Sequence, residues 1–143
     1  SRYNFDNGFS VSGNATWTDA EISKDLFNEA LVGKTPRRQA DFIYTITPQY
    51  ESEYFTIGAA LQGSTEYFVQ DSNELKQDAY LLMNLFATYH VTDSFSVSLN
   101  INNATDEFVI TESEESNAMV GDIIRARPLN GRTSSIQFKY LFD

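Results

Sequence analysis

The sequence contains no cysteine, and it has little proline, histidine or basic charge. Without cysteine there can be no disulfide framework and no thiolate metal site. The single histidine, His90, excludes a metal centre built from several imidazoles, and its position beside a predicted turn favours an ordinary turn residue. Ten basic residues against twenty acidic ones give a net charge of −10, which argues against a nucleic acid partner.

Long hydrophobic runs and catalytic motifs are missing as well. The longest uncharged stretch, residues 79–92, is shorter than the ~20 apolar residues that a membrane-spanning helix needs. No positively charged start precedes an apolar run, so no signal peptide is expected. There is no nucleophile motif and no glycine-rich phosphate loop, so we predict no catalytic, cofactor-binding or metal-ligating residue. A helical membrane protein is excluded, and an enzyme has little support.

What the sequence does contain is a regular alternation of apolar and polar residues. From Phe95 to Asn102, for example, Phe, Val, Leu and Ile are separated by Ser and Asn. A period of two is typical of a β-strand with two different faces. Six stretches follow this pattern, at approximately 8–23, 39–50, 54–68, 78–90, 94–103 and 128–142, and helical spacing competes only at 25–32. We therefore predict an all-β chain, an antiparallel up-and-down meander of about six long strands.

The connections between these strands alternate in length. Tight turns are predicted at 51–53 and 91–93, and Asn7-Gly8 before the first strand is a favoured hairpin dipeptide. The other connections are long and polar, at approximately 24–38, 69–77 and 104–127. All tight turns would then lie at one end of the sheet and all long loops at the other. Transmembrane β-barrels have this asymmetry, with short periplasmic turns and long extracellular loops.

The composition of the two faces agrees with a barrel in a membrane. Ser, Thr, Asn and Gln on one face suit a wet lumen, and the apolar rows on the other face suit lipid. The last stretch needs such a cover because Ile136, Phe138, Tyr140 and Phe142 all lie on one face with no later chain to pack on them. Aromatic residues near the strand ends could form interfacial girdles. Two alternatives remain open: a soluble β-sandwich or barrel that binds sugar or protein, with the same rows as its core, and a small complete outer-membrane barrel acting as a porin or adhesin.

Charged residues gather at the predicted long-loop end. The basic ones, Arg37, Arg38, Arg125, Arg127 and Arg132, could contact lipopolysaccharide or an acidic ligand through bidentate guanidinium bonds, or could balance the acidic loops. An acidic run, Asp106, Glu107, Glu112, Glu114 and Glu115, with Asp122 beyond it, could hold a divalent cation. Because the run lacks the regular spacing of a calcium loop, it indicates a solvated loop.

Several short motifs follow one another in an order that resembles a known family. They are Gly13–Ala20 (GNATWTDA) on a strand, Gly33–Ala40 (GKTPRRQA) leaving a long loop, Tyr89 closing a strand, and Leu99–Phe108 (LNINNATDEF), which is similar to the family's NLxDxxY. Gly131-Arg132 then leads into a final strand that ends in Phe142. This order resembles the C-terminal end of the β-barrel of TonB-dependent outer-membrane receptors. Ala40, where many members have a second proline, and Asp143, which follows the usually terminal phenylalanine, depart from the pattern.

The resemblance implies more than the residues alone predict. Residues 1–143 would be the C-terminal portion of a 22-stranded barrel that takes up a scarce nutrient, such as siderophore-bound iron, a vitamin or an oligosaccharide, in the outer membrane of a Gram-negative bacterium. Implied partners are the remainder of the barrel and its plug domain, TonB through an N-terminal part outside this chain, and lipid. The terminal residues Ile136, Phe138, Tyr140 and Phe142 resemble the signal that the barrel-assembly machinery reads. No cofactor is implied.

Overall fold

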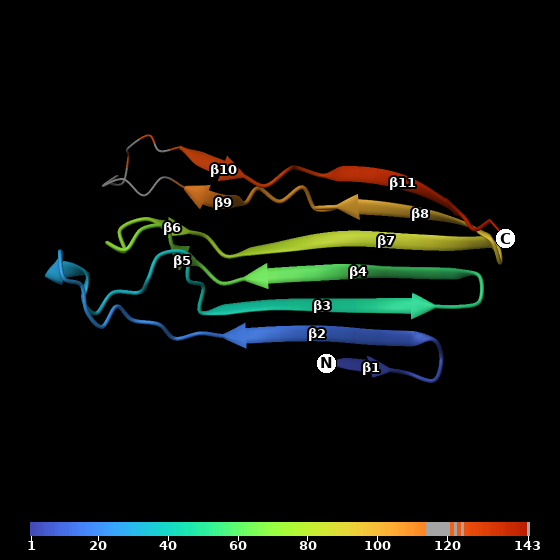
Figure 1. Cartoon of the computed structure of the whole chain (residues 1–143), viewed down its shortest axis with the longest axis horizontal. Coiled ribbons are helices and arrows are strands. Elements are labelled where there is room, and N and C mark those ends of the chain that lie inside the picture. The colour runs from blue at the N-terminus through green and yellow to red at the C-terminus, as the bar shows by residue number, and fades with distance from the viewer. Residues whose placement is uncertain (114–120, 122, 124, 143) are drawn as a thin grey trace.

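The computed structural model describes residues 1–113, 121, 123 and 125–142, and its main element is one antiparallel sheet. Its seven strands are neighbours in chain order, β1-β2-β3-β4-β7-β8-β11 (Figure 1). Their bounds are Arg2–Asn4, Phe9–Trp17, Phe42–Glu51, Phe55–Ser64, Tyr80–Thr92, Phe95–Asn102 and Thr133–Tyr140. The predicted up-and-down meander is confirmed.

Smaller elements extend the long connections. β5 (Tyr67–Phe68) pairs with β6 (Lys76–Gln77), and β9 (Ile110–Ser113) pairs with β10 (Ala126–Pro128). A single 3-10 turn, η1 (Glu29–Leu31), falls in the region where helical spacing competes with alternation. In the described part of the chain, no helix is long and apolar enough to cross a membrane, a finding that does not bear on crossing by strands.

Some of the predicted strand bounds were wrong. The first strand ends at Trp17 rather than at 23, because the backbone of Ile22 pairs with Gly33 and Lys34 inside its own loop. The predicted strand 54–68 is two elements, since the backbone and side chain of Thr65 close the ladder against Phe42 and the chain then turns into β5. The predicted strand 128–142 begins only at Thr133, and Pro128 belongs to β10.

The register of the sheet places the apolar rows of all strands on one face. Directly opposed residues of antiparallel strands share a face, and the pairs run Trp17 to Phe42, Ile46 to Leu61, Leu61 to Met83, Ala87 to Leu99, and Leu99 to Ile136. The same register opposes polar residues, such as Asn14 to Thr45 and Ser98 to both Thr88 and Gln137. The hydroxyls of Thr88 and Ser98 are 2.8 Å apart. The sheet therefore has one apolar and one polar face.

Two glycines let aromatic rings lie flat on the sheet. A Cβ on Gly63 would be 2.2 Å from the ring of its cross-strand partner Tyr44. A Cβ on Gly58 would be 2.4 Å from the ring of its partner Phe86. Phe86 is an apolar residue on the otherwise polar face, and it covers a position where the opposing strand has no side chain.

The apolar face of the sheet has no covering layer within the described residues. Leu99 is 42% exposed, Ile136 64% and Phe138 69%. The described apolar residues that are buried, Ala40, Val69 and Val109, all lie outside the seven strands, at their loop end. An apolar area of this extent on a sheet marks a surface that another phase or molecule must cover.

Aromatic pairs occupy both ends of this apolar face. Trp17 and Phe42, with ring centroids 6.2 Å apart, lie at the loop end. Tyr50 and Phe55 (5.7 Å), and Phe95 and Phe138 (6.5 Å, stacked), lie nearer the short turns. Figure 1 shows the short turns together at one end of the sheet and the long connections at the other.

Candidate functional site at the loop end of the sheet

Three long connections meet at the loop end: 18–41 between β2 and β3, 65–79 between β4 and β7, and 103–132 between β8 and β11. They contain the buried residues Ala40, Val69 and Val109 and most of the described side-chain hydrogen bonds that join distant parts of the chain. This end of the sheet is therefore built to hold loops in fixed positions.

The first contact joins residues 34–38 to residues 68–73. The Asn73 side chain accepts a hydrogen bond from the Thr35 N–H (2.9 Å) and donates one to the Thr35 carbonyl (2.8 Å). Asn73 has φ +58°, a left-handed conformation that asparagine tolerates better than most residues. The Lys34 ammonium donates to the Ser72 carbonyl at 2.6 Å. We call these contacts the Thr35–Asn73 lock.

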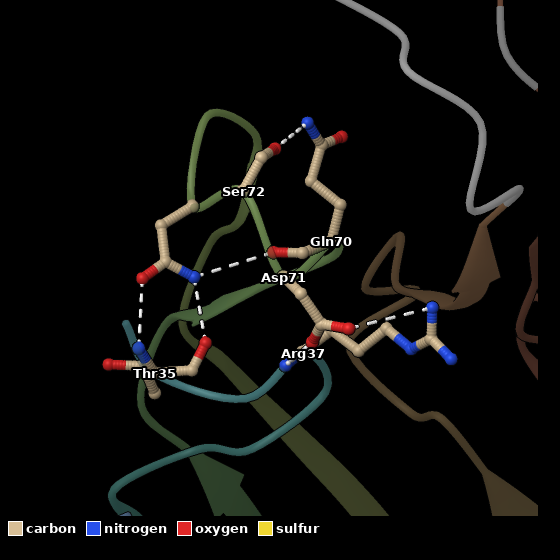
Figure 2. A network of polar contacts seen from close by, with 6 residues as sticks. Thr35, Arg37, Gln70, Asp71 and Ser72 are labelled. Carbon is tan, nitrogen blue, oxygen red and sulfur yellow. Dashed lines mark hydrogen bonds and ion pairs between the residues drawn. The ribbon is translucent and has the colours of Figure 1, made fainter. Parts of the chain in front are cut away.

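Arg37 and Arg38 belong to the same contact. The Arg37 N–H donates to Asp71 Oδ1 at 2.8 Å, and its guanidinium lies 3.8 Å from Asp71 Oδ2 (Figure 2). Arg38, with φ +60°, donates its N–H to the Phe68 carbonyl at 2.7 Å. The Arg37–Asp71 pair is partly exposed, so its free energy is small. It joins one predicted basic residue to an acidic residue of the β4–β7 connection.

Beyond the lock, the β2–β3 loop forms a capped tip. Asp25 Oδ1 accepts the N–H groups of Phe27 (2.8 Å) and Asn28 (2.7 Å), and these bonds lower the pKa of Asp25. Asn28 in turn accepts the N–H of Ala30 and begins η1. Phe27 is 99% exposed at this tip, which Figure 1 shows at the far end of the long axis.

Tyr67 connects the middle connection to the third one. Its hydroxyl donates to the Ile110 carbonyl of β9 at 3.2 Å. Burial, with a smaller contribution from Tyr80, raises the pKa of Tyr67 above its usual value. The phenol therefore remains a donor at neutral pH. Because Arg38 bonds to Phe68, the neighbour of Tyr67, the three connections form one continuous assembly.

The third connection is tied at its base by Asn103 and Asp106. Asn103 is 3% exposed, and its side chain accepts the Glu107 N–H (2.8 Å) and donates to the carbonyls of Glu107 (2.9 Å) and Asn130 (3.2 Å). Asp106 Oδ1 accepts the Arg132 N–H at 2.7 Å. These bonds hold the two ends of the connection together.

The predicted arginines therefore lie in two different connections. Arg37 and Arg38 are in the β2–β3 loop, whereas Arg127 lies in β10 opposite Glu112 and Arg125 comes just before it. The β4–β7 connection bridges the two groups through Phe68 and Tyr67. Of the acidic run, Glu114, Glu115 and Asp122 lie outside the described residues. Within the described part, no three His, Asp or Glu residues come close enough to hold a metal ion.

The terminal residues are divided by the end of β11. Ile136, Phe138 and Tyr140 occupy alternate positions of the strand on the apolar face. Phe142 lies beyond the strand, is 88% exposed, and places its ring 4.8 Å from that of Tyr140 in an edge-to-face arrangement. The Leu141 N–H still donates to the Ser94 carbonyl at 2.8 Å, which holds this end against the β7–β8 turn.

Comparison with known proteins identifies the fold. Residues 1–104 match the model of the family described as TonB dependent receptor-like, beta-barrel. The chain belongs to this family. No curated protein matches it in sequence.

Solved structures extend the likeness over nearly the whole chain. The siderophore receptor PiuA from Acinetobacter baumannii is 20% identical, with a TM-score of 0.77 over 96% of this chain and 20% of that one. The ferric yersiniabactin uptake receptor FyuA from Yersinia pestis is 18% identical, with a TM-score of 0.81 over 99% and 22%. The ferric citrate transporter FecA is 13% identical, with a TM-score of 0.76 over 93% and 21%. The chain thus has the fold of about a fifth of such a receptor.

Sequence reasoning did not find Asn73, Tyr67 or Asn103 as organisers of this site. For Asn73 the available signal was the polar run Gln70–Glu74, in which asparagine is the residue best suited to a left-handed turn. For Tyr67 there was no signal, since its partner is the backbone of a residue 43 positions away.

We predict that Asn73→Ala will open the β2–β3 loop of the receptor. The substitution removes two hydrogen bonds to Thr35, worth about 1 kcal/mol each, and it strains a left-handed backbone position. The rate of trypsin cleavage at Lys34, Arg37 and Arg38 depends on the population of the open loop, so this rate should increase about tenfold or more.

Gln77→Ala is the matched control, because its amide bonds only to the adjacent Asp78 carbonyl among the described contacts. Asn73→Gly removes the side-chain amide but adopts the positive φ without strain. It therefore separates the loss of the hydrogen bonds from the backbone strain. Cleavage of Asn73→Ala at the same rate as Gln77→Ala would show that the lock does not hold the loop.

Proposed function

We propose that this chain is the C-terminal portion of a 22-stranded barrel, in an outer-membrane receptor that imports a scarce nutrient with energy supplied through TonB. Membership of the receptor family supports this proposal. The observation that carries it is the continuous apolar face, which stays in register from β2 to β11 and has no cover within the described chain. Lipid is the cover that such a face fits, because hydrocarbon accepts apolar side chains and the paired strands satisfy their own backbone groups.

The polar face fits the inside of the same barrel. Its Ser, Thr, Asn and Gln side chains are polar, as is the interior of a water-filled or plugged barrel. We propose that this face meets the plug domain, and that TonB and the plug act through a part of the receptor outside this chain. The terminal residues Ile136, Phe138, Tyr140 and Phe142 are proposed to be read by the barrel-assembly machinery.

A metal chelate is the first ligand class to test. The relatives named above are a siderophore receptor, a ferric yersiniabactin uptake receptor and a ferric citrate transporter. Vitamins and oligosaccharides remain in the proposal as other scarce nutrients. Arg37, Arg38, Arg125 and Arg127 are proposed contacts for an anionic ligand or for lipopolysaccharide, because guanidinium groups bind carboxylate and phosphate oxygens in pairs. The relatives are transport proteins, and we propose no enzymatic activity.

The two alternatives are less well supported. A small complete barrel needs at least eight strands that close on themselves, whereas the seven described strands form an open sheet with β1 and β11 at its edges. A soluble β-domain would cover its apolar rows with a second layer, and the described residues form none.

The proposed function is tested by uptake in cells. Deleting the gene for the whole receptor should abolish energy-dependent uptake of one radiolabelled nutrient from a panel of ferric chelates, vitamins and oligosaccharides. If that nutrient is a ferric chelate, growth should be lost when the chelate is the only iron source. Complementation with the intact gene should restore uptake, and loss of TonB should prevent it. Unchanged uptake of every chelate, vitamin and oligosaccharide in the panel after deletion would refute the proposal.

The lipid-facing assignment predicts different effects of a charge at two adjacent positions of β8. Leu99→Lys should destabilise the inserted receptor by about 2–4 kcal/mol, the cost of a basic residue at the bilayer midplane. Asn100→Lys, on the polar face opposite Ser135, should change stability little. The urea midpoint of each receptor in lipid vesicles measures this difference. Similar midpoints for the two variants would contradict the assignment.

The terminal strand predicts a different loss of yield for two adjacent substitutions. Phe142→Ala should lower the amount of membrane-inserted receptor far more than Leu141→Ala, because only Phe142 continues the row formed by Ile136, Phe138 and Tyr140. Quantifying folded receptor in purified outer membranes tests this expectation. If both variants insert equally well, Phe142 is an ordinary aromatic residue at the end of a strand.

A further inference from the structure

The pairing of β8 with β11 has no short turn to fix its register. In a tight hairpin the turn decides which residues face each other. Here the two strands are joined by residues 103–132. The alternation of apolar and polar residues excludes a register shift of β11 by one residue, because that shift would exchange its faces. It does not exclude a shift by two residues. After a two-residue shift, Ile136 and Phe138 would still lie on the apolar face.

The β9–β10 hairpin lies within the connection between β8 and β11, and its register differs from theirs. Below it, Asn102 pairs with Thr133, and pairing resumes above at Val109 and Leu129. The six residues 103–108 therefore lie opposite the three residues 130–132, and a further register shift lies within β9–β10, between Arg127 and Pro128. The β9–β10 ladder therefore does not pass its register on to β8–β11, and residues 103–108 have to take up the difference.

Asn103 and Asp106 take up this difference. Both have left-handed backbones, with φ +49° and +59°, which fold the extra residues out of the ladder. The buried Asn103 amide then spans the fold through Glu107 and reaches the Asn130 carbonyl at 3.2 Å. Asp106 Oδ1 fixes the N–H of Arg132 at 2.7 Å, one residue before β11 begins. Residues 130 and 132 are thereby tied directly to the end of β8.

We propose that Asn103 and Asp106 are positioning residues that set the register of the final strand. Their side chains do what a short turn does in a tight hairpin: they fix which residues of β8 and β11 pair. The register they select brings Phe138 opposite Val97 and Tyr140 opposite Phe95. It also places the end of the chain beside the β7–β8 turn, where Leu141 bonds to Ser94. The β9–β10 hairpin can then vary without shifting the strand below it.

Cysteine pairs in the whole receptor measure this register directly, because the chain contains no cysteine of its own. Ser98→Cys with Gln137→Cys reports the native register, in which these residues are directly opposed. Ser98→Cys with Ser135→Cys, and Ser98→Cys with Lys139→Cys, report shifts of two residues in either direction. Directly opposed cysteines oxidise far more readily than diagonal ones, because a disulfide needs Cβ atoms about 4 Å apart.

With Asn103 and Asp106 intact, the native pair should dominate among inserted molecules. Adding Asn103→Ala or Asp106→Ala should lower the native-pair fraction several-fold and raise a shifted pair. Asp106→Asn, which keeps an acceptor oxygen for Arg132, should restore most of the native fraction. Asn102→Ala is the matched control, since its side chain makes one 3.4 Å contact with Thr133 and is exposed.

A native-pair fraction that is unchanged in both Asn103→Ala and Asp106→Ala would overturn the inference. If Asn103→Ala is degraded, the comparison of Asp106→Ala with Asp106→Asn tests the inference, because both variants keep the buried Asn103 amide. The proposal rests on the membrane setting inferred above, but its outcome is separate. A receptor that imports no nutrient can still show the native crosslink, and an importing receptor with an unchanged crosslink pattern would refute only the role of Asn103 and Asp106.

Discussion

Antiparallel pairing from β2 to β11 keeps directly opposed residues on the same side of the sheet, and the other properties of this structure depend on that register. Each strand alternates, but alternation in one strand produces only a local stripe. The ladders connect the stripes, so that Trp17 in β2 and Ile136 in β11 lie on the same face although 119 positions separate them in the printed sequence. A shift of one residue anywhere would exchange apolar and polar side chains across every later strand.

The chain divides its packing between two regions. Over the span of the sheet, the apolar side chains have no cover within the described residues, and we propose that lipid covers them. At the loop end, three connections are packed on one another through buried Val69 and Val109, the Thr35–Asn73 lock, and the bonds of Tyr67 and Asn103. Most of these contacts are hydrogen bonds from polar side chains to backbone groups. They satisfy loop N–H and C=O groups that have no partner in a strand. The result is one continuous assembly of the three connections at the loop end of the sheet.

Much of the fold could be predicted from the sequence, because the signal was local. Alternation from Phe95 to Asn102 identifies a strand and its faces, and the unequal connections identify the two ends of the sheet. The strand bounds were less accurate where local pattern and long-range pairing disagree. Ile22 lies inside the predicted strand 8–23 but pairs with its own loop, and Tyr67 lies inside the predicted strand 54–68 but belongs to a separate hairpin. Asn103 and Asp106 could be seen as a motif, yet their bonds to Asn130 and Arg132 depend on residues about 26 positions away. No periodicity contains that information.

The most direct test of the account is the environment of each residue along β8 in the whole receptor within lipid vesicles. Nitroxide labels placed one at a time from position 95 to position 101 report accessibility to oxygen, which concentrates in lipid, and to a water-soluble nickel chelate. The account predicts a period of two, with high oxygen access at positions 95, 97, 99 and 101 and relatively higher access to the nickel chelate at positions 96, 98 and 100. Equal access of the nickel chelate to positions 97 and 98, or the opposite alternation, would contradict it.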